Sequence, residues 1–187
     1  MSKKDRLPPG QRLVDDFPVF QYGDIPELDE KKWSFFITGL VEKPMKLIYK
    51  EFLALPSTEL TTDFHCVTGW SKVDLHWKGI LFNAVASMAK PSSGAQFVEI
   101  IAEQGYTTNL PLSVVMDDDV LLAYGLNGKP LTRGHGFPLR LVVPKRYAYK
   151  SAKWVRRVEF LKEDRPGFWE KRGYSNSADL WKEERFS

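Results

Sequence analysis

The stretch TELTTDFHCVTGWS, from Thr58 to Ser71, contains the pattern on which the fold prediction rests. In its first half apolar or β-branched residues alternate with polar ones, so that Leu60, Phe64 and Cys66 share one face. A period of two residues is typical of a half-buried β-strand. We therefore predict a strand that ends near Cys66, the only cysteine of the 187-residue chain, with His65 on the opposite face.

Outward from this strand, segments rich in aromatic and β-branched residues predict further strands at 33–40, 95–103, 120–126, 139–144 and 152–161, and residues 45–49 are expected to pair back onto the first. The predicted helices are short: 50–55, 80–90 with Asn83 as its N-cap, and a turn at 110–118. Asn127 and Gly128 indicate a tight hairpin, because a type I′ turn needs positive φ at both positions. Strands do not alternate regularly with helices, which favours an α+β fold with a mixed, mainly antiparallel sheet.

The length suits one domain of ordinary size. Residues 1–18, which include Pro8, Pro9 and Gly10, are predicted to form an extended arm, and residues 19–187 a single domain. A lone cysteine forms no internal disulfide, and the first residues lack the apolar core of a secretory signal. We therefore expect a cytoplasmic protein.

The chain has no run of about 18 apolar residues, so no membrane span is expected. Its net charge is only +3, but residues 140–172 hold eleven Lys or Arg against four Asp or Glu. Such a local excess suits an anion such as a phosphate, or an acidic partner, although a solvated surface is the simpler explanation. Nucleic-acid binding is not expected, because the aromatic residues in this part have the pattern of strand cores rather than of a stacking platform.

A second candidate region is RGHGFPLRLVVPKRYAYKSAKWV, Arg133 to Val155. Its glycines leave the backbone around His135 free to turn sharply. Arg140, Lys150, Ser151 and Lys153 follow, and arginine, lysine and serine all bind phosphate oxygens. From spacing alone, Cys66 is either a buried apolar residue or a reactive thiol, and the region around Arg140 is either a solvated strand or an anion site.

Taken together, the two regions resemble the molybdopterin-binding domain of the sulfite oxidase superfamily. FHCVTGWS is similar to the segment whose cysteine ligates molybdenum there, and LNGKPLTRGHGFPLRLVVPKRYAYKSAKWVRRVEF is similar to the pterin-binding segment. HWKGI and ITGLVEKPMKL also resemble segments of that family and occur in the same order. The resemblance extends from about Phe17 to Phe186 and implies the mixed α+β fold of the family.

The resemblance implies that Cys66 is the catalytic ligand of molybdenum. It implies that the molybdopterin cofactor is bound by a set of side chains that contains His65, Cys66, His135, Arg140, Ser151 and Lys153. Tyr22 and Trp70 are candidates for the rim of the substrate pocket.

The sequence departs from sulfite oxidases directly after the cysteine. Those enzymes have paired arginines there, whereas VTGWS carries no charge, and EDRPGFW has no counterpart of their active-site tyrosine. Sulfite is a dianion that needs cationic partners to leave water. We therefore expect oxygen-atom and two-electron transfer on a small, uncharged S-oxide or N-oxide instead of sulfite.

One cysteine cannot hold an iron–sulfur cluster, and no haem attachment motif is present, so a separate electron-transfer protein is expected as partner. Two alternatives stay open at this point. The chain could be a molybdopterin-binding or carrier module without catalysis of its own, or a metal-free thiol protein that uses Cys66.

Overall fold

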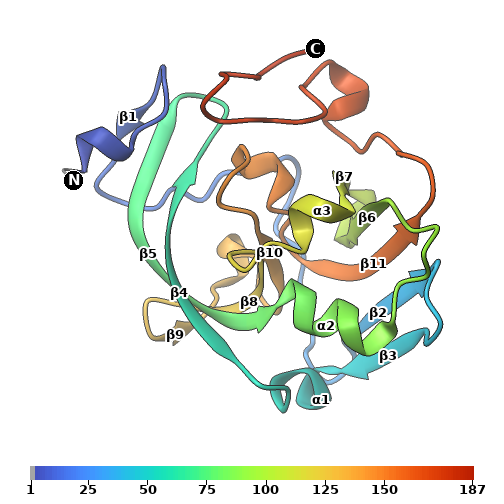
Figure 1. Ribbon diagram of the computed structural model, residues 1–187. Coiled ribbons are helices and arrows are strands. Elements are labelled where there is room, and N and C mark those ends of the chain that lie inside the picture. The colour runs from blue at the N-terminus through green and yellow to red at the C-terminus, as the bar shows by residue number, and fades with distance from the viewer. Residues whose placement is uncertain (1–2) are drawn as a thin grey trace.

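The computed structural model describes residues 3–187 (Figure 1). The first two residues of the predicted arm lie outside the described part. The rest of the arm begins with a 3-10 turn, η1 (Lys4–Arg6), and continues into the two-residue strand β1 (Arg12–Leu13). β1 pairs in parallel with β5 (Trp70–Leu81), with Arg12 opposite Trp70 and Leu13 opposite Ser71. The arm is therefore attached to the strand that follows Cys66.

The strands form two sheets. Sheet A contains β1, β5, β4 (Thr58–His65), β8 (Leu121–Leu126), β9 (Lys129–Pro130) and β10 (Arg140–Val142). Sheet B contains, in order, β3 (Met45–Ile48), β2 (Ser34–Gly39), β11 (Val155–Leu161), β6 (Phe97–Ala102) and β7 (Thr107–Pro111). Only the pairs β1–β5 and β2–β11 are parallel in the described chain. The predicted mixed, mainly antiparallel α+β class is confirmed.

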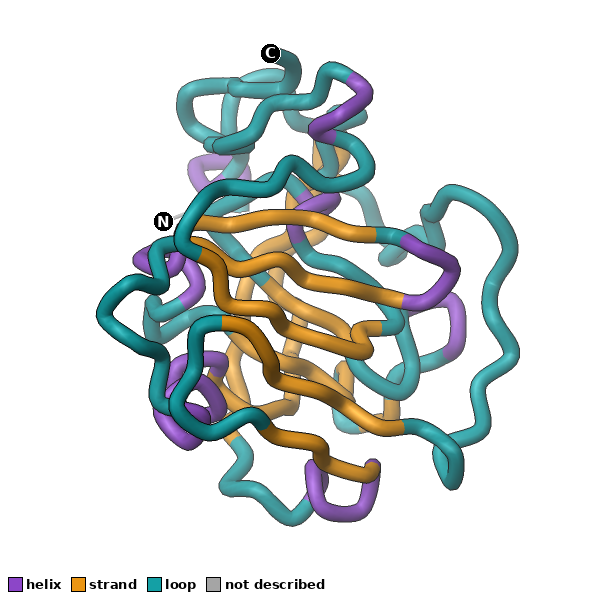
Figure 2. Tube along the Cα trace, turned by 90° about the vertical axis from the view of Figure 1, so that its right-hand side faces the viewer, coloured by secondary structure: helices purple, strands orange, loops and turns teal. Residues whose placement is uncertain are grey.

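Helices are few and short, as predicted. They are α1 (Tyr49–Leu53), α2 (Phe82–Ala89) and α3 (Leu112–Val115), with 3-10 turns η2 (Glu103–Gly105), η3 (Arg133–His135), η4 (Ala148–Lys150) and η5 (Glu170–Arg172). Of the described helices, none is long and apolar enough to cross a bilayer. β4 and β5 form the left side of Figure 1 and sheet B the right side, and Figure 2 shows sheet B with its strands side by side.

Two sequence expectations differ from the structure. Asn83 is not the N-cap of α2; Leu81 is, and the Asn83 side chain instead donates to Asp118 Oδ1 at 3.0 Å. No strand was expected over 70–79, yet β5 is a 12-residue strand that pairs with β1, β4 and β8. Val73, Leu75 and Trp77 alternate here with polar residues, so the period of two that is typical of a strand is present in the sequence and the prediction missed it.

The Asn127–Gly128 hairpin is confirmed. Asn127 has φ +50° and Gly128 φ +74°, and these residues connect β8 to β9. Both central residues therefore adopt the left-handed region that a type I′ turn requires.

Apolar packing among the described residues divides into a main core and two smaller clusters. The main core includes Phe35 of sheet B, Phe52 of α1 and Trp33, which directly precedes β2. One smaller cluster lies beneath the C-terminal segment and contains Tyr147, Tyr149, Ala178 and Leu180. The cluster beside Cys66 surrounds the end of β4 and consists of Phe64, Cys66, Trp70, Leu75, Trp77, Leu121, Ala123, Leu131 and Val142. Each large apolar side chain buried this way contributes roughly 1.5–3 kcal/mol. The cluster makes a rigid base for the loop that carries the thiol.

Candidate cofactor-binding and active site

A cavity of about 370 Å³ lies between the arm and the loops that follow β4 and flank β10. Seven of the eight residues predicted for the site line it: Tyr22, Cys66, Trp70, His135, Arg140, Ser151 and Lys153. These residues come from distant parts of the sequence, so the fold brings together the two regions that the sequence analysis singled out.

Cys66 lies at the start of a tight turn. Its backbone N–H donates to the Trp70 carbonyl at 2.8 Å, and its own carbonyl accepts from the Gly69 N–H at 3.0 Å. Gly69 has φ +96°, which a residue with a Cβ rarely adopts. The Thr68 hydroxyl donates to the Cys66 Sγ at 3.1 Å. The thiol is buried, but it faces the cavity and has a hydrogen-bond donor beside it, so it is more than an apolar residue of the core.

Trp70 closes this turn and packs edge-on against Phe17 and alongside Phe64. Its indole Nε1 is buried and has no acceptor among the described residues. Burying an amine-type donor without a partner is unfavourable. Trp70 lines the cavity with its side chain, while this N–H lies buried without a partner among the described residues.

Arg140 is a buried cation without a carboxylate. It is 2% exposed, and its Nη1 and Nη2 donate to the carbonyls of His135 and Ser151 at 3.0 and 3.2 Å. Its Nε has no partner in the described chain. The guanidinium also lies 5.0 Å from the Phe64 ring centre. Burial lowers the pKa of Arg140 to about 9, so the group is still charged at neutral pH.

Lys153 adds a second cation to the same cavity. Its Nζ donates to the Gly134 carbonyl at 2.6 Å and lies 3.4 Å from the Gln21 Oε1. Burial, together with the charge of Arg140, lowers the pKa of Lys153 to about 7. Among the described residues neither cation has a carboxylate partner within salt-bridge distance. A buried Arg140 and a partly buried Lys153, neighbours without an anion, fit a ligand with an anionic end, such as the phosphate of the implied pterin.

His135 and Ser151 position Arg140, because their backbone carbonyls accept hydrogen bonds from its guanidinium. The His135 Nε2 donates to the Phe17 carbonyl at 3.1 Å, its Nδ1 accepts from Thr132 at 2.9 Å, and the ring stacks on Phe17 at 4.8 Å. Burial lowers the pKa of His135, with smaller contributions from nearby cations. The Ser151 hydroxyl accepts from the Val143 N–H at 2.9 Å. Both residues line the cavity while positioning Arg140 through their carbonyls.

His65 does not line the cavity, contrary to the prediction that it contacts the cofactor. Strand alternation turns its side chain away from Cys66, and its Nδ1 lies 2.7 Å from the buried Ser71 hydroxyl. Burial lowers the pKa of His65 to about 4, so the ring is neutral at physiological pH. Its place is behind the Cys66 loop.

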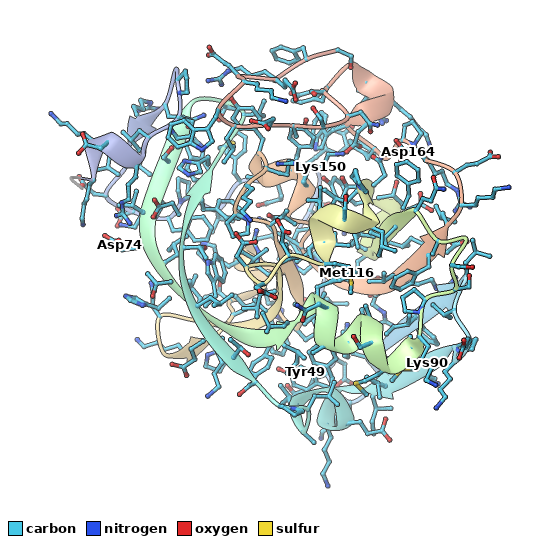
Figure 3. The ribbon with its side chains drawn as sticks, viewed as in Figure 1. Tyr49, Asp74, Lys90, Met116, Lys150 and Asp164 are labelled. Atoms are coloured by element: carbon cyan, nitrogen blue, oxygen red, sulfur yellow. The ribbon has the colours of Figure 1, made fainter. Side chains whose placement is uncertain are left out.

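Lys150, part of the predicted phosphate-binding cluster, also points elsewhere. It is completely buried and forms an ion pair with Glu170 at 2.5 Å. Its Nζ also donates to the backbone and side-chain oxygens of Asn109 at 2.8 and 3.2 Å. Figure 3 shows Lys150 in the interior, beneath the C-terminal segment, with Asp164 farther out on that segment. Lys150 therefore ties the C-terminal segment to β7 and does not face a ligand.

Much of the remaining wall of the cavity is aromatic, and apart from Tyr22 and Trp70 no sequence pattern predicts this lining. Tyr22 is 67% exposed and packs against Phe168 at 5.1 Å and Trp169 at 5.8 Å. Deeper in, the Tyr106 hydroxyl donates to the Tyr149 carbonyl at 2.5 Å, so this side chain presents its ring to the cavity. No local signal marks these residues, because Tyr106, Tyr149 and Phe168 come together only through tertiary packing.

Comparisons with known proteins support the same assignment. The family model described as oxidoreductase molybdopterin binding domain matches residues 22–169. An uncharacterized oxidoreductase of Bacillus subtilis, YuiH, is 45% identical over 187 residues, which is all of this chain and 94% of that protein. The protein-methionine-sulfoxide reductase catalytic subunit MsrP of Campylobacter jejuni is 33% identical over 157 residues, 75% of this chain and 52% of that protein.

Sulfite oxidase of Arabidopsis thaliana is 32% identical over 197 residues, 86% of this chain and 50% of that enzyme. The chain thus spans about half the length of MsrP and of sulfite oxidase. Among solved structures, the sulfane dehydrogenase SoxCD from Paracoccus pantotrophus superposes with a TM-score of 0.69 at 25% identity, over 75% of this chain and 41% of that one. The chain belongs to the oxidoreductase molybdopterin-binding domain family of the sulfite oxidase superfamily, and it is a molybdopterin-dependent oxidoreductase.

Proposed function

We propose that this chain reduces a small, uncharged S-oxide or N-oxide at a molybdenum ion ligated by Cys66. One observation carries the proposal: a single cavity joins the Cys66 thiol to the buried Arg140 and the partly buried Lys153, and its other walls are mainly aromatic. A thiolate is a soft ligand suited to such a metal, and two neighbouring cations that have no carboxylate partner among the described residues are suited to a phosphate.

In this assignment Cys66 binds the metal and Thr68 donates to its sulfur. Arg140 and Lys153 bind the anionic end of the pterin, and the carbonyls of His135 and Ser151 keep the Arg140 fork in place. When bound, the group supplies two-electron oxygen-atom transfer. The protein supplies binding, orientation and the electrostatics of the cavity.

The charge of the cavity argues for an uncharged substrate. Of the described residues that line it, Arg140 and Lys153 are the only Lys or Arg, and the anionic end of the pterin occupies both. Glu103 also lines the cavity, but it pairs with Arg156 at 3.2 Å. A sulfite dianion would enter without a cation to replace its hydration, which is unfavourable. The relative MsrP is a protein-methionine-sulfoxide reductase, which agrees with an S-oxide as substrate.

The net reaction consumes one S-oxide or N-oxide, two electrons and two protons, and it yields the sulfide or amine and one water. Because the sequence contains a single cysteine, it cannot ligate an iron–sulfur cluster as an internal electron store. We infer that a separate electron-transfer protein delivers the electrons. A cytoplasmic location stays a prediction, which fractionation of the native host tests.

Production in a host that makes molybdopterin tests the proposal. We expect about one molybdenum per chain, turnover of methionine sulfoxide or trimethylamine N-oxide with reduced viologen as electron donor, and no oxidation of sulfite. Cys66→Ala should lose the metal and the activity but keep its fold. Full molybdenum content in Cys66→Ala would refute the ligand assignment, and rapid sulfite oxidation would refute the substrate class.

A further inference from the structure

The N-terminal arm contacts the backbone carbonyl of Cys66 through a side-chain hydrogen bond. The Gln11 side chain donates from Nε2 to the Cys66 carbonyl at 3.0 Å, although the two residues are 55 positions apart. The same Gln11 accepts at Oε1 from the Ser71 hydroxyl at 3.0 Å. Ser71 is completely buried and lies 2.7 Å from the His65 Nδ1.

The donor and the acceptor of each hydrogen bond in this series, from His65 through Ser71 and Gln11 to Cys66, follow from the chemistry of the groups. A carbonyl only accepts, so the Gln11 NH₂ faces Cys66 and its Oε1 faces Ser71. The single Ser71 hydroxyl proton is then used on Gln11, which leaves its oxygen to accept from His65. His65 must therefore carry its proton on Nδ1.

Neighbouring backbone contacts keep the arm against the loop. The Arg12 N–H donates to the Gly69 carbonyl and the Val14 N–H to the Ser71 carbonyl, both at 3.0 Å. Arg185 near the C-terminus donates to the Val67 carbonyl and, at 3.3 Å, to the Pro9 carbonyl. The arm and the C-terminal segment thus hold both sides of the turn that presents the thiol.

We propose that Gln11 is a positioning residue for Cys66 and that the directed chain His65–Ser71–Gln11 sets the orientation of the Cys66 peptide, and hence of its thiol. The inference rests on the proposed function only in taking Cys66 as the metal ligand. His65 thereby acts through Ser71 and Gln11 and has no contact with the cofactor. Supporting partners of this kind commonly tune a metal site, because they fix the orientation of its ligand.

The first test uses the protein without cofactor. We compare Gln11→Glu, which keeps the acceptor for Ser71 but removes the donor to Cys66, with Gln11→Met, which removes both. Gln96→Met, at an exposed position directly before β6 of the other sheet, is the matched control. Alkylation of the buried Cys66 by iodoacetamide should be at least several-fold faster in both Gln11 variants and unchanged in the control. Equal rates in all three variants and the wild type would overturn the proposal, provided that circular dichroism shows them folded.

The second test reads the hydrogen-bond direction itself. Long-range ¹H–¹⁵N NMR of the histidines should show His65 protonated on Nδ1 in the wild type, with that preference lost in Ser71→Ala. Protonation on Nε2 in the wild type would overturn the proposed chain.

The third test uses protein loaded with cofactor. Gln11→Met should keep its molybdenum but show a shifted or broadened Mo(V) electron paramagnetic resonance signal, because the ligand geometry changes. A signal identical to that of the wild type would overturn the positioning role. Retention of molybdenum by Cys66→Ala, with the alkylation and NMR results as expected, would instead refute the proposed function and leave the Gln11 chain intact.

Discussion

Replacing Lys153 with methionine should stabilise the cofactor-free protein and weaken its hold on the cofactor. Without an anion in the cavity, the charged Lys153 lies beside the buried Arg140, and its pKa is about 7 instead of 10.5. The folded state therefore disfavours this charge. Methionine has a similar length and no charge, so the variant removes the unfavourable term while it still fills the space.

The size of the effect follows from the pKa. A difference of about 3.5 pKa units, at about 1.4 kcal/mol each, corresponds to roughly 5 kcal/mol. Because Lys153 is partly exposed and loses a hydrogen bond to Gly134 on substitution, we discount this to about 2 kcal/mol. For a chain of this size that is a rise in Tm of about 4–8 °C.

The pH dependence has a defined sign. The pKa of Lys153 is lower in the folded state, so its penalty is complete below about pH 7 and disappears as the pH rises toward 10.5. In that window the unfolded chain binds more protons, and the stability of the wild type increases with pH. The gain from Lys153→Met should therefore be largest at pH 6 and should decline toward pH 10.

Thermal unfolding of cofactor-free protein at several pH values measures this effect, with Lys129→Met on the exposed β9 hairpin as the control. In loaded protein the sign reverses, since a charge-assisted hydrogen bond of about 1.5–3 kcal/mol is lost. Retention of the pterin should fall by roughly tenfold to a hundredfold. A Lys153→Met variant that is destabilised equally at pH 6 and pH 9, or that retains the pterin as well as the wild type, would refute the reasoning.

Three further predictions concern the frame of the site. Lys150→Met should cost about 3–5 kcal/mol in denaturant unfolding, because it leaves the buried Glu170 carboxylate unpaired; a Lys150→Met/Glu170→Leu double variant should recover part of that loss. Thr68→Val should lower the midpoint potential of the bound molybdenum in a redox titration, since the hydroxyl that withdraws charge from the Cys66 sulfur is gone; an unchanged potential would contradict this reading. Gly39→Ala should destabilise the protein by about 1–3 kcal/mol or more, because Gly39 has φ +84° and a Cβ would lie 2.2 Å from the Phe160 carbonyl; an unaltered unfolding midpoint would rule this out.

The N-terminal arm shows which of its features a local sequence pattern predicts and which it does not. The sequence predicts an extended arm over residues 1–18; in the structure Arg12 and Leu13 form the strand β1, whereas Lys4–Arg6 form a 3-10 turn. The sequence does not indicate that the Gln11 side chain donates to the Cys66 carbonyl. Nor does it indicate that Arg6 of the arm donates to Asp74 Oδ1 on β5 at 2.7 Å; Figure 3 shows Asp74 at the edge of the molecule. These contacts join residues more than 50 positions apart, and only the parallel pairing of β1 with β5 brings them together.

His65 and Lys150 show the same limit at the site. Both stand next to functional residues in the sequence and both are polar, so a motif assigns them to the cofactor. A one-residue step reverses the direction of a side chain along a strand and turns it by about 120° along a 3-10 helix, however. His65 therefore meets Ser71 and Lys150 meets Glu170, while their neighbours Cys66 and Ser151 line the cavity.

The amino-acid sequence by itself determined the class of fold, the family, and the importance of Cys66, Arg140 and Lys153. The alternation of apolar and polar residues, the turn residues and the order of the motifs are properties of the sequence itself, so they can be recognised without the tertiary structure. The tertiary structure alone decided which side chains face the cavity, that the two cations lack an anion, and that the cavity walls are aromatic. Those properties depend on burial and on contacts between distant residues, which exist only once both sheets, the arm and the C-terminal segment have packed together.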